Sequence, residues 1–128
     1  MLLLTQDQRA RLIANGNSRG DHAPVVKLFS PVSAATWLFS ELDEDGDSLF
    51  GLCDLGFGCP ELGSASLAEI ADVKLPLGLS IERDLHFEGR VTLTIYADAA
   101  RLIGRITEEE MRLKAAARAQ ETAELPPP

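Results

Sequence analysis

The chain has 128 residues, the length of one ordinary domain, and its 12 basic and 20 acidic side chains give a net charge of −8. Apolar residues make up 45% of the sequence and charged residues 25%, a globular composition that excludes a collagen or a low-complexity chain. The acidic balance argues against direct binding of nucleic acid, which requires a basic surface.

The N-terminal residues and the cysteines bear on where the protein is found. Residues 1–4 are too short for the apolar region of a signal peptide, and no basic residue precedes them. No apolar run approaches the ~20 residues of a membrane-spanning helix. We therefore expect a cytoplasmic protein without a membrane partner, in which Cys53 and Cys59 are free thiols.

The first half of the chain predicts one helix and a set of strands. Thr5 and Gln8 have the spacing of a capping box, which predicts a helix over 6–15 that ends at Gly16. Apolar, β-branched and aromatic runs predict strands over residues 25–29, 36–42, 49–55 and 61–65. A polar turn with several acidic residues joins the second and third strands, so we expect these two to form an antiparallel hairpin.

The second half predicts a short helix, one more strand and a longer helix. Ser66 and Glu69 have the capping-box spacing and open a short helix that ends near residue 73. Apolar and polar residues alternate over 81–87, which predicts a fifth strand. Arg83 would lie on its mostly apolar face, where it needs an acidic partner or an exposed edge. Apolar residues then recur at helical spacing over 93–103.

A third capping box at Thr107 predicts an Ala-rich helix near the C-terminus. Glu108 with Arg112, and Glu110 with Lys114, have the i,i+4 spacing of favourable ion pairs. The helix has few large apolar residues, so we expect it to project from the domain and to be the surface of a homodimer.

Together these elements predict an α+β fold with a mainly antiparallel sheet, an N-terminal helix, a short middle helix and C-terminal helices. We assign residues 1–106 to a single domain, 107–121 to the Ala-rich charged helix and 122–128 to a disordered tail.

The charge distribution is the sharpest feature of the sequence. From Leu28 to Val73 there are nine acidic residues and no Lys or Arg. Such a stretch can be a solvated turn and surface that blocks pairing at a sheet edge. It can also be a docking surface for a basic partner. The residues that would contact the partner are Glu41, Asp43, Glu44, Asp45 and Asp47.

Metal and thiol sites are the competing interpretations of this region. Alternating aspartates over 43–47 resemble the start of a calcium loop, but the sixth position is Ser48 and the twelfth is Asp54, where an EF-hand has Gly and Glu. The spacing of Cys53 and Cys59 falls outside that of common zinc sites. We expect a plain polar turn and a cysteine in the core, and we assign no metal, cofactor or catalytic residue.

A second group of polar residues offers a different site. On one face of the predicted strand, His86 would lie beside two carboxylates and could transfer protons. The competing interpretation is a solvated face with local ion pairs. The members of this possible polar site are Asp54, Glu61, Glu82, Arg83, Asp84 and His86.

Several segments in fixed order resemble a family of short bacterial proteins that is known as a domain of unknown function. The segments are 25–29, 35–38 with 41–43, 50–56, 60–63, 66–67 and 81–87, and the resemblance covers residues 2–106. It implies a protein carried on conjugative plasmids, integrative elements and phages, where related domains accompany anti-restriction and other counter-defence modules. It implies no catalytic residue. Cys59 and the Ala-rich helix depart from the family pattern.

These observations lead to two hypotheses of different classes. The first is a non-enzymatic acidic binding protein of a mobile genetic element, of the anti-restriction or anti-CRISPR type, that engages a basic surface of a host protein. The second is a small metal-dependent hydrolase or nuclease-like enzyme that uses carboxylates and a histidine around Mg²⁺ or Mn²⁺. Its residues would be Asp54, Glu61, Glu82, Asp84 and His86. An accessory domain that only dimerises is a third, blander possibility.

Overall fold

A computed structural model, which describes residues 2–124, gives the chain four α-helices and five strands in one sheet. The helices are α1 (Gln6–Gly16), α2 (Leu67–Ala71), α3 (Leu93–Ile103) and α4 (Glu110–Glu124). The strands are β1 (Val26–Phe29), β2 (Thr36–Leu42), β3 (Ser48–Asp54), β4 (Glu61–Ser66) and β5 (Glu82–Arg83). A short 3₁₀ turn, Pro76–Gly78, lies between α2 and β5.

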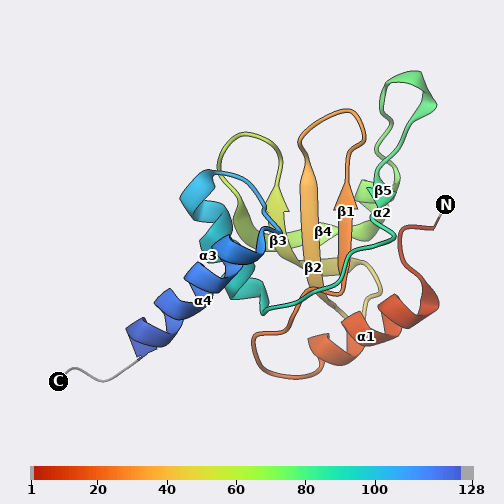
Figure 1. Cartoon of the computed structure of the whole chain (residues 1–128). Helices are drawn as coiled ribbons and strands as arrows, with labels where there is room; N and C mark the ends of the chain where they lie inside the picture. Colours follow the sequence, from red (N-terminus) through yellow and green to blue (C-terminus); the bar gives the residue numbers. More distant parts are fainter. Residues whose placement is uncertain (1, 125–128) are drawn as a thin grey trace.

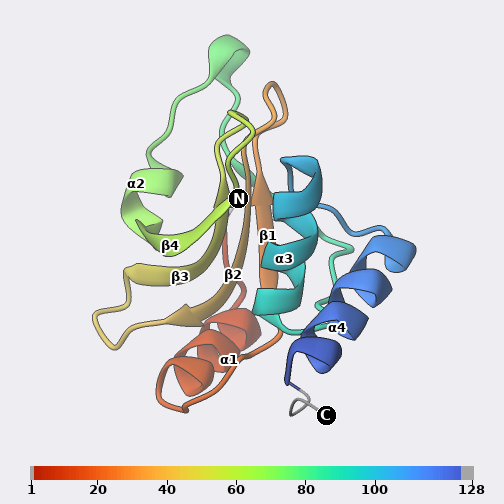
Figure 2. The ribbon, with the colours of Figure 1, turned by 90° about the vertical axis from the view of Figure 1, so that its left-hand side faces the viewer.

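The sheet is antiparallel throughout, with the strand order β4-β3-β2-β1-β5. Helices α1 and α2 lie on one face of the sheet, and α3 and α4 lie on the other (Figures 1 and 2). The expected α+β class is therefore confirmed, as is the hairpin of β2 and β3. Because β2 lies between two neighbours and two helical layers, both of its faces are buried, which explains why the apolar residues Trp37, Leu38 and Phe39 follow one another without alternation.

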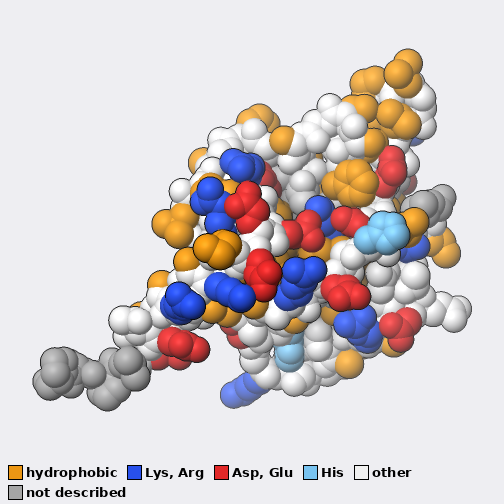
Figure 3. Space-filling model, viewed as in Figure 1, with side chains coloured by type: hydrophobic (Ala, Val, Ile, Leu, Met, Phe, Trp, Pro, Cys, Tyr) orange, Lys and Arg blue, Asp and Glu red, His pale blue; other side chains and the backbone are white. Residues whose placement is uncertain are grey.

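Residues 73–80, which we call the finger, project beyond the rest of the molecule between α2 and β5 (Figure 1). Apolar side chains gather at this projection in the space-filling view (Figure 3). Two backbone hydrogen bonds close its tip, from Leu75 N to Leu79 O at 2.9 Å and from Leu79 N to Pro76 O at 3.2 Å.

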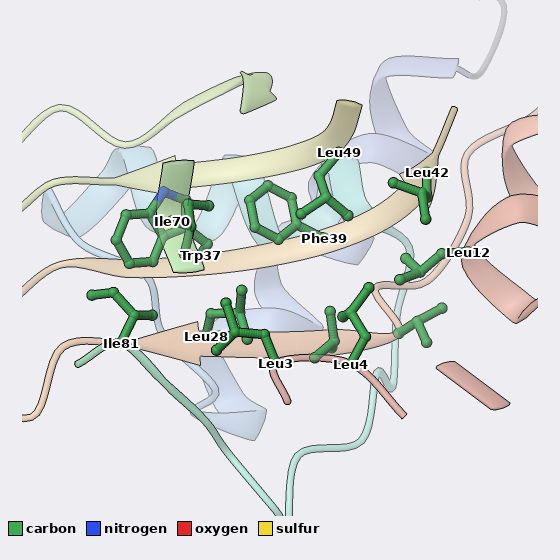
Figure 4. Packing of buried hydrophobic residues seen from close by; sticks show 12 residues of the cluster. Leu3, Leu4, Leu12, Leu28, Trp37, Phe39, Leu42, Leu49, Ile70 and Ile81 are labelled. Atoms are coloured by element: carbon green, nitrogen blue, oxygen red, sulfur yellow. The ribbon is translucent and has the colours of Figure 1, made fainter. Parts of the chain in front are cut away.

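The core has two parts, one on each face of the sheet. Trp37 and Phe39 of β2 belong to the cluster on the side of α1 and α2, where the Phe39 ring lies beside Leu49 (Figure 4). Leu38, between them in the sequence, points to the opposite face and packs against α3 and α4. Because successive side chains of a strand point to opposite faces, β2 contributes to both parts of the core.

Local signals placed the first two helices. Thr5 Oγ1 accepts from Gln8 N and Thr5 N donates to Gln8 Oε1, both at 3.0 Å, so the predicted capping box is formed. Ser66 Oγ accepts from Glu69 N at 3.2 Å and caps α2. The predicted span of α3, residues 93–103, is also confirmed.

The fifth strand is much shorter than expected. It ends at Arg83, because Asp84 Oδ1 accepts from His86 N at 2.9 Å and turns the chain away from the sheet. The expected common face of Glu82, Asp84 and His86 therefore does not form. Of the two expected arrangements for Arg83, an acidic partner or an exposed edge, the structure shows the edge, because β5 is the last strand of the sheet. Arg83 donates there from Nη1 to Leu2 O at 2.9 Å.

The start of α4 also differs from the prediction. The helix begins at Glu110, and Thr107 Oγ1 accepts from Glu109 N at 3.1 Å, so Thr107 is not the helix N-cap. Glu108 forms an ion pair with Lys27 at 2.6 Å and does not pair with Arg112. The pair of Glu110 with Lys114, at 3.0 Å, is confirmed.

Helix α4 packs on the domain. Leu113 and Ala116 are buried in the cluster that α3 supplies, which leaves Met111 as its exposed large apolar residue. The helix continues to Glu124, so residues 122–124 of the expected tail are helical, and 125–128 lie outside the described residues. Within 2–124, no helix has the length and apolar character that would be needed to cross a membrane.

Candidate functional site

The β2–β3 turn, residues 43–47, carries four of the five predicted partner-binding carboxylates, and we call it the acidic turn. The carboxylate of Asp45 forms hydrogen bonds within this part of the chain. Its carboxylate accepts from Ser48 Oγ at 2.6 Å and from the backbone N of Ser48 and Asp47, both at 2.8 Å. The Ser48 hydroxyl, followed by the two N–H donors, lowers the pKa of Asp45, because all three stabilise the ionised form. Asp45 therefore shapes the turn.

Asp47 joins the acidic turn to α2. Its carboxylate accepts from Ser66 Oγ at 2.7 Å and from Ala68 N at 2.8 Å, and its carbonyl oxygen accepts from Leu67 N at 2.8 Å. Ala68 N belongs to the first turn of α2, where backbone donors have no partner within the helix. Asp47 is thus a helix cap contributed by a distant part of the chain.

Replacing Asp47 by alanine is expected to lower the free energy of unfolding by about 1–2 kcal/mol, because the first turn of α2 and Ser66 both lose an acceptor. Urea unfolding followed by the fluorescence of Trp37 would measure this. Asp43→Ala in the same turn removes an exposed carboxylate, so its effect is expected to stay within ~0.5 kcal/mol. Equal losses for the two variants would contradict the capping role.

Three of the predicted carboxylates have no partner within the described part of the chain. Within residues 2–124, no hydrogen bond or ion pair engages the side chains of Glu41, Asp43 or Glu44; Asp43 and Glu44 are exposed and Glu41 is half-buried on β2. Asp43, Glu44 and Asp45 line a polar hollow of about 330 Å³ together with Gly16 and Asn17 at the end of α1. The structure therefore adds a helix end to the site that the sequence predicted.

The end of α1 strengthens the negative potential of this polar hollow. No basic residue lies in the last turn of α1, so the negative end of its dipole is not offset there. Asn15 holds the helix in place, because its side-chain amide donates to Ser40 O of β2 at 3.0 Å. No local signal connects α1 with residues 43–45, so the sequence could not have indicated this arrangement.

One basic side chain lies at the acidic turn. Arg9 of α1 donates from Nη1 to Gly46 O at 3.4 Å. The absence of basic residues between Leu28 and Val73 in the sequence therefore does not extend to the folded surface. Arg9 offsets part of the charge on one side of the turn, and Asp43 and Glu44 carry the accessible negative charge.

The six residues of the possible polar site are not brought together. Glu61 lies on edge strand β4, and Glu82 lies on β5 at the opposite edge of the sheet. Asp54, at the end of β3, is 3% exposed and accepts from Gly56 N at 2.9 Å and from Ile106 N at 3.1 Å. Its carboxylate is therefore occupied by backbone donors of two connecting segments.

Asp84 belongs to an ion-pair group that the sequence did not indicate. Lys27 of β1 lies between Asp84, at 3.5 Å, and Glu108, at 2.6 Å. The group ties β1 to the segment after β5 and to the segment before α4. It was missed because its members are far apart in the sequence.

The cysteines are free thiols in the structure, as expected. Cys53 is half-buried and packs against the core, and burial raises the pKa of its thiol. A raised pKa keeps the thiol protonated, so Cys53 is a poor nucleophile. Its place in the core agrees with the prediction, whereas Cys59 is exposed.

A family model described as "Protein of unknown function (DUF2958)" matches residues 3–107. The chain belongs to the DUF2958 family. The match extends from the start of the N-terminal segment to Thr107, so α4 lies beyond the matched region. No curated protein and no solved structure matches the chain.

Carboxylates are exposed on this DUF2958 domain, but within residues 2–124 they are not grouped into a metal-binding site. Among its described residues, no group of three or more His, Cys, Asp or Glu side chains is placed to hold a metal ion. Asp54 lies at the far end of β3 from the acidic turn, so it cannot complete the loop suggested by the alternating aspartates. The acidic turn exposes the carboxylates of Asp43 and Glu44.

Proposed function

We propose that this DUF2958 domain is a non-enzymatic binding protein of a mobile genetic element that engages a basic surface of a host protein, in the manner of counter-defence proteins. The observation that carries the proposal is the pair of exposed, unpaired carboxylates of Asp43 and Glu44 beside the end of α1. The mobile-element context follows from the family resemblance, and such a partner would be met in the host cytoplasm.

The polar hollow favours a lysine or arginine side chain. A cation there would interact with Asp43, Glu44 and the carbonyl end of α1. Each exposed ion pair contributes only ~0.2–1 kcal/mol, so several are needed and binding should weaken as salt rises. A concentrated negative surface also speeds the encounter with a basic partner and selects against acidic ones.

The acidic turn is held in place before a partner arrives. Asp45 binds the backbone of the turn and Asp47 binds α2, so the chain around the free carboxylates has little freedom to lose. A preorganised surface avoids part of the entropic cost of binding. Of the four acidic residues in this turn, Asp45 and Asp47 therefore stabilise its conformation, and Asp43 and Glu44 have carboxylates without a partner.

The test is a charge reversal with a matched control. The double variant Asp43→Lys/Glu44→Lys changes the net charge by +4, and so does Glu121→Lys/Glu124→Lys on α4, away from the acidic turn. Tagged full-length protein would capture partners from a bacterial host lysate at low and high salt, with identification by mass spectrometry.

We expect the wild type and the α4 variant to retain the same basic proteins at low salt and to release them at high salt. The acidic-turn variant is expected to lose them by more than about tenfold, since several ion pairs become repulsive. Equal capture by all three proteins would refute the proposal. Equal loss in both variants would show that net charge matters and that the acidic turn does not.

A further inference from the structure

The finger presents one leucine almost completely to solvent. Leu77 is 95% exposed, the highest value among the large apolar residues of the described chain. The finger lies between α2 and β5, whereas the acidic turn lies at the other end of the sheet (Figure 2). The finger is therefore separate from the proposed partner-binding turn.

The backbone of the finger holds Leu77 in an unfavourable conformation. Leu77 has φ 62° and Gly78 has φ 73°, and the Leu79 N–H donates to Pro76 O across them. Two positive φ values in succession are the pattern of a type I′ turn, for which Asn-Gly is the preferred pair. Leucine is disfavoured there because its Cβ crowds the backbone, at a cost of roughly 1–2 kcal/mol. In an isolated chain, the exposure of the Leu77 side chain and the positive φ of its backbone are therefore both unfavourable.

An apolar hollow of about 310 Å³ opens near the base of the finger, lined mainly by leucines and other apolar residues. It lies between the N-terminal segment, α2 and the start of β5. Its apolar lining comes from Leu2, Leu3, Leu4, Leu67, Ala71 and Ile81. A cavity of about 150 Å³ is left when one leucine is truncated, so this hollow has room for a leucine side chain.

The finger and the apolar hollow contain no acidic residue, although the chain as a whole is acidic. The finger contains one charged residue, Lys74, and the lining of the apolar hollow contains one, Arg9. None of the 20 acidic residues lies on either surface. A contact between two copies here therefore brings no acidic side chains together. Arg9 is directed toward the acidic turn, where it donates to Gly46 O at 3.4 Å.

We propose that two copies of this chain form a symmetric dimer in which Leu77 of each copy enters the apolar hollow of the other. The finger and the hollow share Ser80 and lie side by side, so one two-fold axis makes the same contact twice. The occupant is a second copy because the chain itself carries both the protruding leucine and an apolar hollow large enough for it. Burial in the partner compensates for the exposure and backbone strain of Leu77.

The test is sedimentation velocity on the full chain from about 1 to 200 µM, which reports the concentration-dependent monomer–dimer equilibrium. Leu77→Asn removes the apolar side chain and supplies a residue that tolerates positive φ, so folding is preserved. Ala71→Arg places a charge in the apolar hollow. Met111→Asn is the control, because Met111 is 82% exposed on α4, the surface that the sequence suggested for a dimer.

The wild type and Met111→Asn are expected to dimerise alike, whereas Leu77→Asn and Ala71→Arg each raise the dissociation constant by more than about tenfold. Thermal melts of Leu77→Asn should show no loss of stability of the monomer. A mixture of Leu77→Asn with Ala71→Arg retains one intact contact per mixed dimer, so it should associate more than either variant alone. Any of four results would overturn the proposal. The wild type could be monomeric over the whole concentration range, or Leu77→Asn could dimerise as the wild type does. Dimerisation could be lost only in Met111→Asn, or the mixture could associate no more than the two variants alone.

Discussion

Replacing Gly51 by alanine is expected to lower the free energy of unfolding by at least about 3 kcal/mol, or to prevent folding. Gly51 lies in β3 opposite Phe39 of β2, where the pairing register shifts. A Cβ at this position would overlap the Leu38 carbonyl oxygen and lie 2.7 Å from Phe39 Cα. These neighbours are backbone atoms of a central strand and cannot rotate away, so β2 and β3 would have to separate.

A neighbouring glycine provides the matched control. Gly63 of β4 pairs with Gly51, and a Cβ built on it meets no atom within 4 Å. Gly63→Ala is therefore expected to be neutral or slightly stabilising, since alanine loses less conformational entropy on folding. Urea unfolding monitored by Trp37, the single tryptophan, would compare the two variants. Similar stabilities would show that the close approach of β2 is not what requires glycine at position 51.

Replacing Asp54 by asparagine is expected to cost about 2–3 kcal/mol of stability. The carboxylate accepts from Gly56 N through one oxygen and from Ile106 N through the other, in a site that is 3% exposed. The asparagine amide is nearly the same size but must place an NH₂ group against one of these donors. That donor is then buried without an acceptor, and a charged hydrogen bond is replaced by a neutral one.

Glu61→Gln is the control for Asp54→Asn, because Glu61 belongs to the same predicted polar site but is exposed on β4. Its effect on chemical unfolding is expected to stay within ~0.5 kcal/mol. This difference would establish Asp54 as a structural acceptor that joins the end of β3 to the segment before α4. A neutral Asp54→Asn would instead show that these two hydrogen bonds contribute little to stability.

Short-range signals were sufficient for most secondary structure. The capping hydroxyls of Thr5 and Ser66 each act within three residues, so the sequence is enough to place α1 and α2. Strand β2 was predicted with its observed bounds because its apolar run and the polar turn after it are both local. The predicted start of α4 was wrong: the Thr107 hydroxyl accepts from Glu109 N, two residues on, and Glu108 pairs with Lys27, 81 residues away in the sequence.

Contacts between segments that are far apart in the sequence fix the start of α3 and the position of α4. The N-terminus of α3 is capped by Asp21, which accepts from both the backbone N and the hydroxyl of Thr94. Gln120 of α4 then donates to Thr94 Oγ1 at 3.2 Å and to Asp98 Oδ2 at 2.9 Å. Neither contact has a sequence pattern, because Asp21 and Thr94 are 73 residues apart and Gln120 meets α3 only when α4 packs on it.

By itself the sequence determined the fold class, the order of the elements and the acidic character of the β2–β3 turn, because these follow from short-range periodicity, capping and charge. Only the tertiary structure decided which carboxylates are free. Asp47 is held by Ser66 and Ala68, which folding brings to it, and Asp45 is held within its own turn by Ser48. Asp43 and Glu44 stay in solvent beside the end of α1. The tertiary structure likewise separated Glu61 from Glu82. Strand order places residues on the same or opposite edges of a sheet, and strand order depends on the packing of the whole chain.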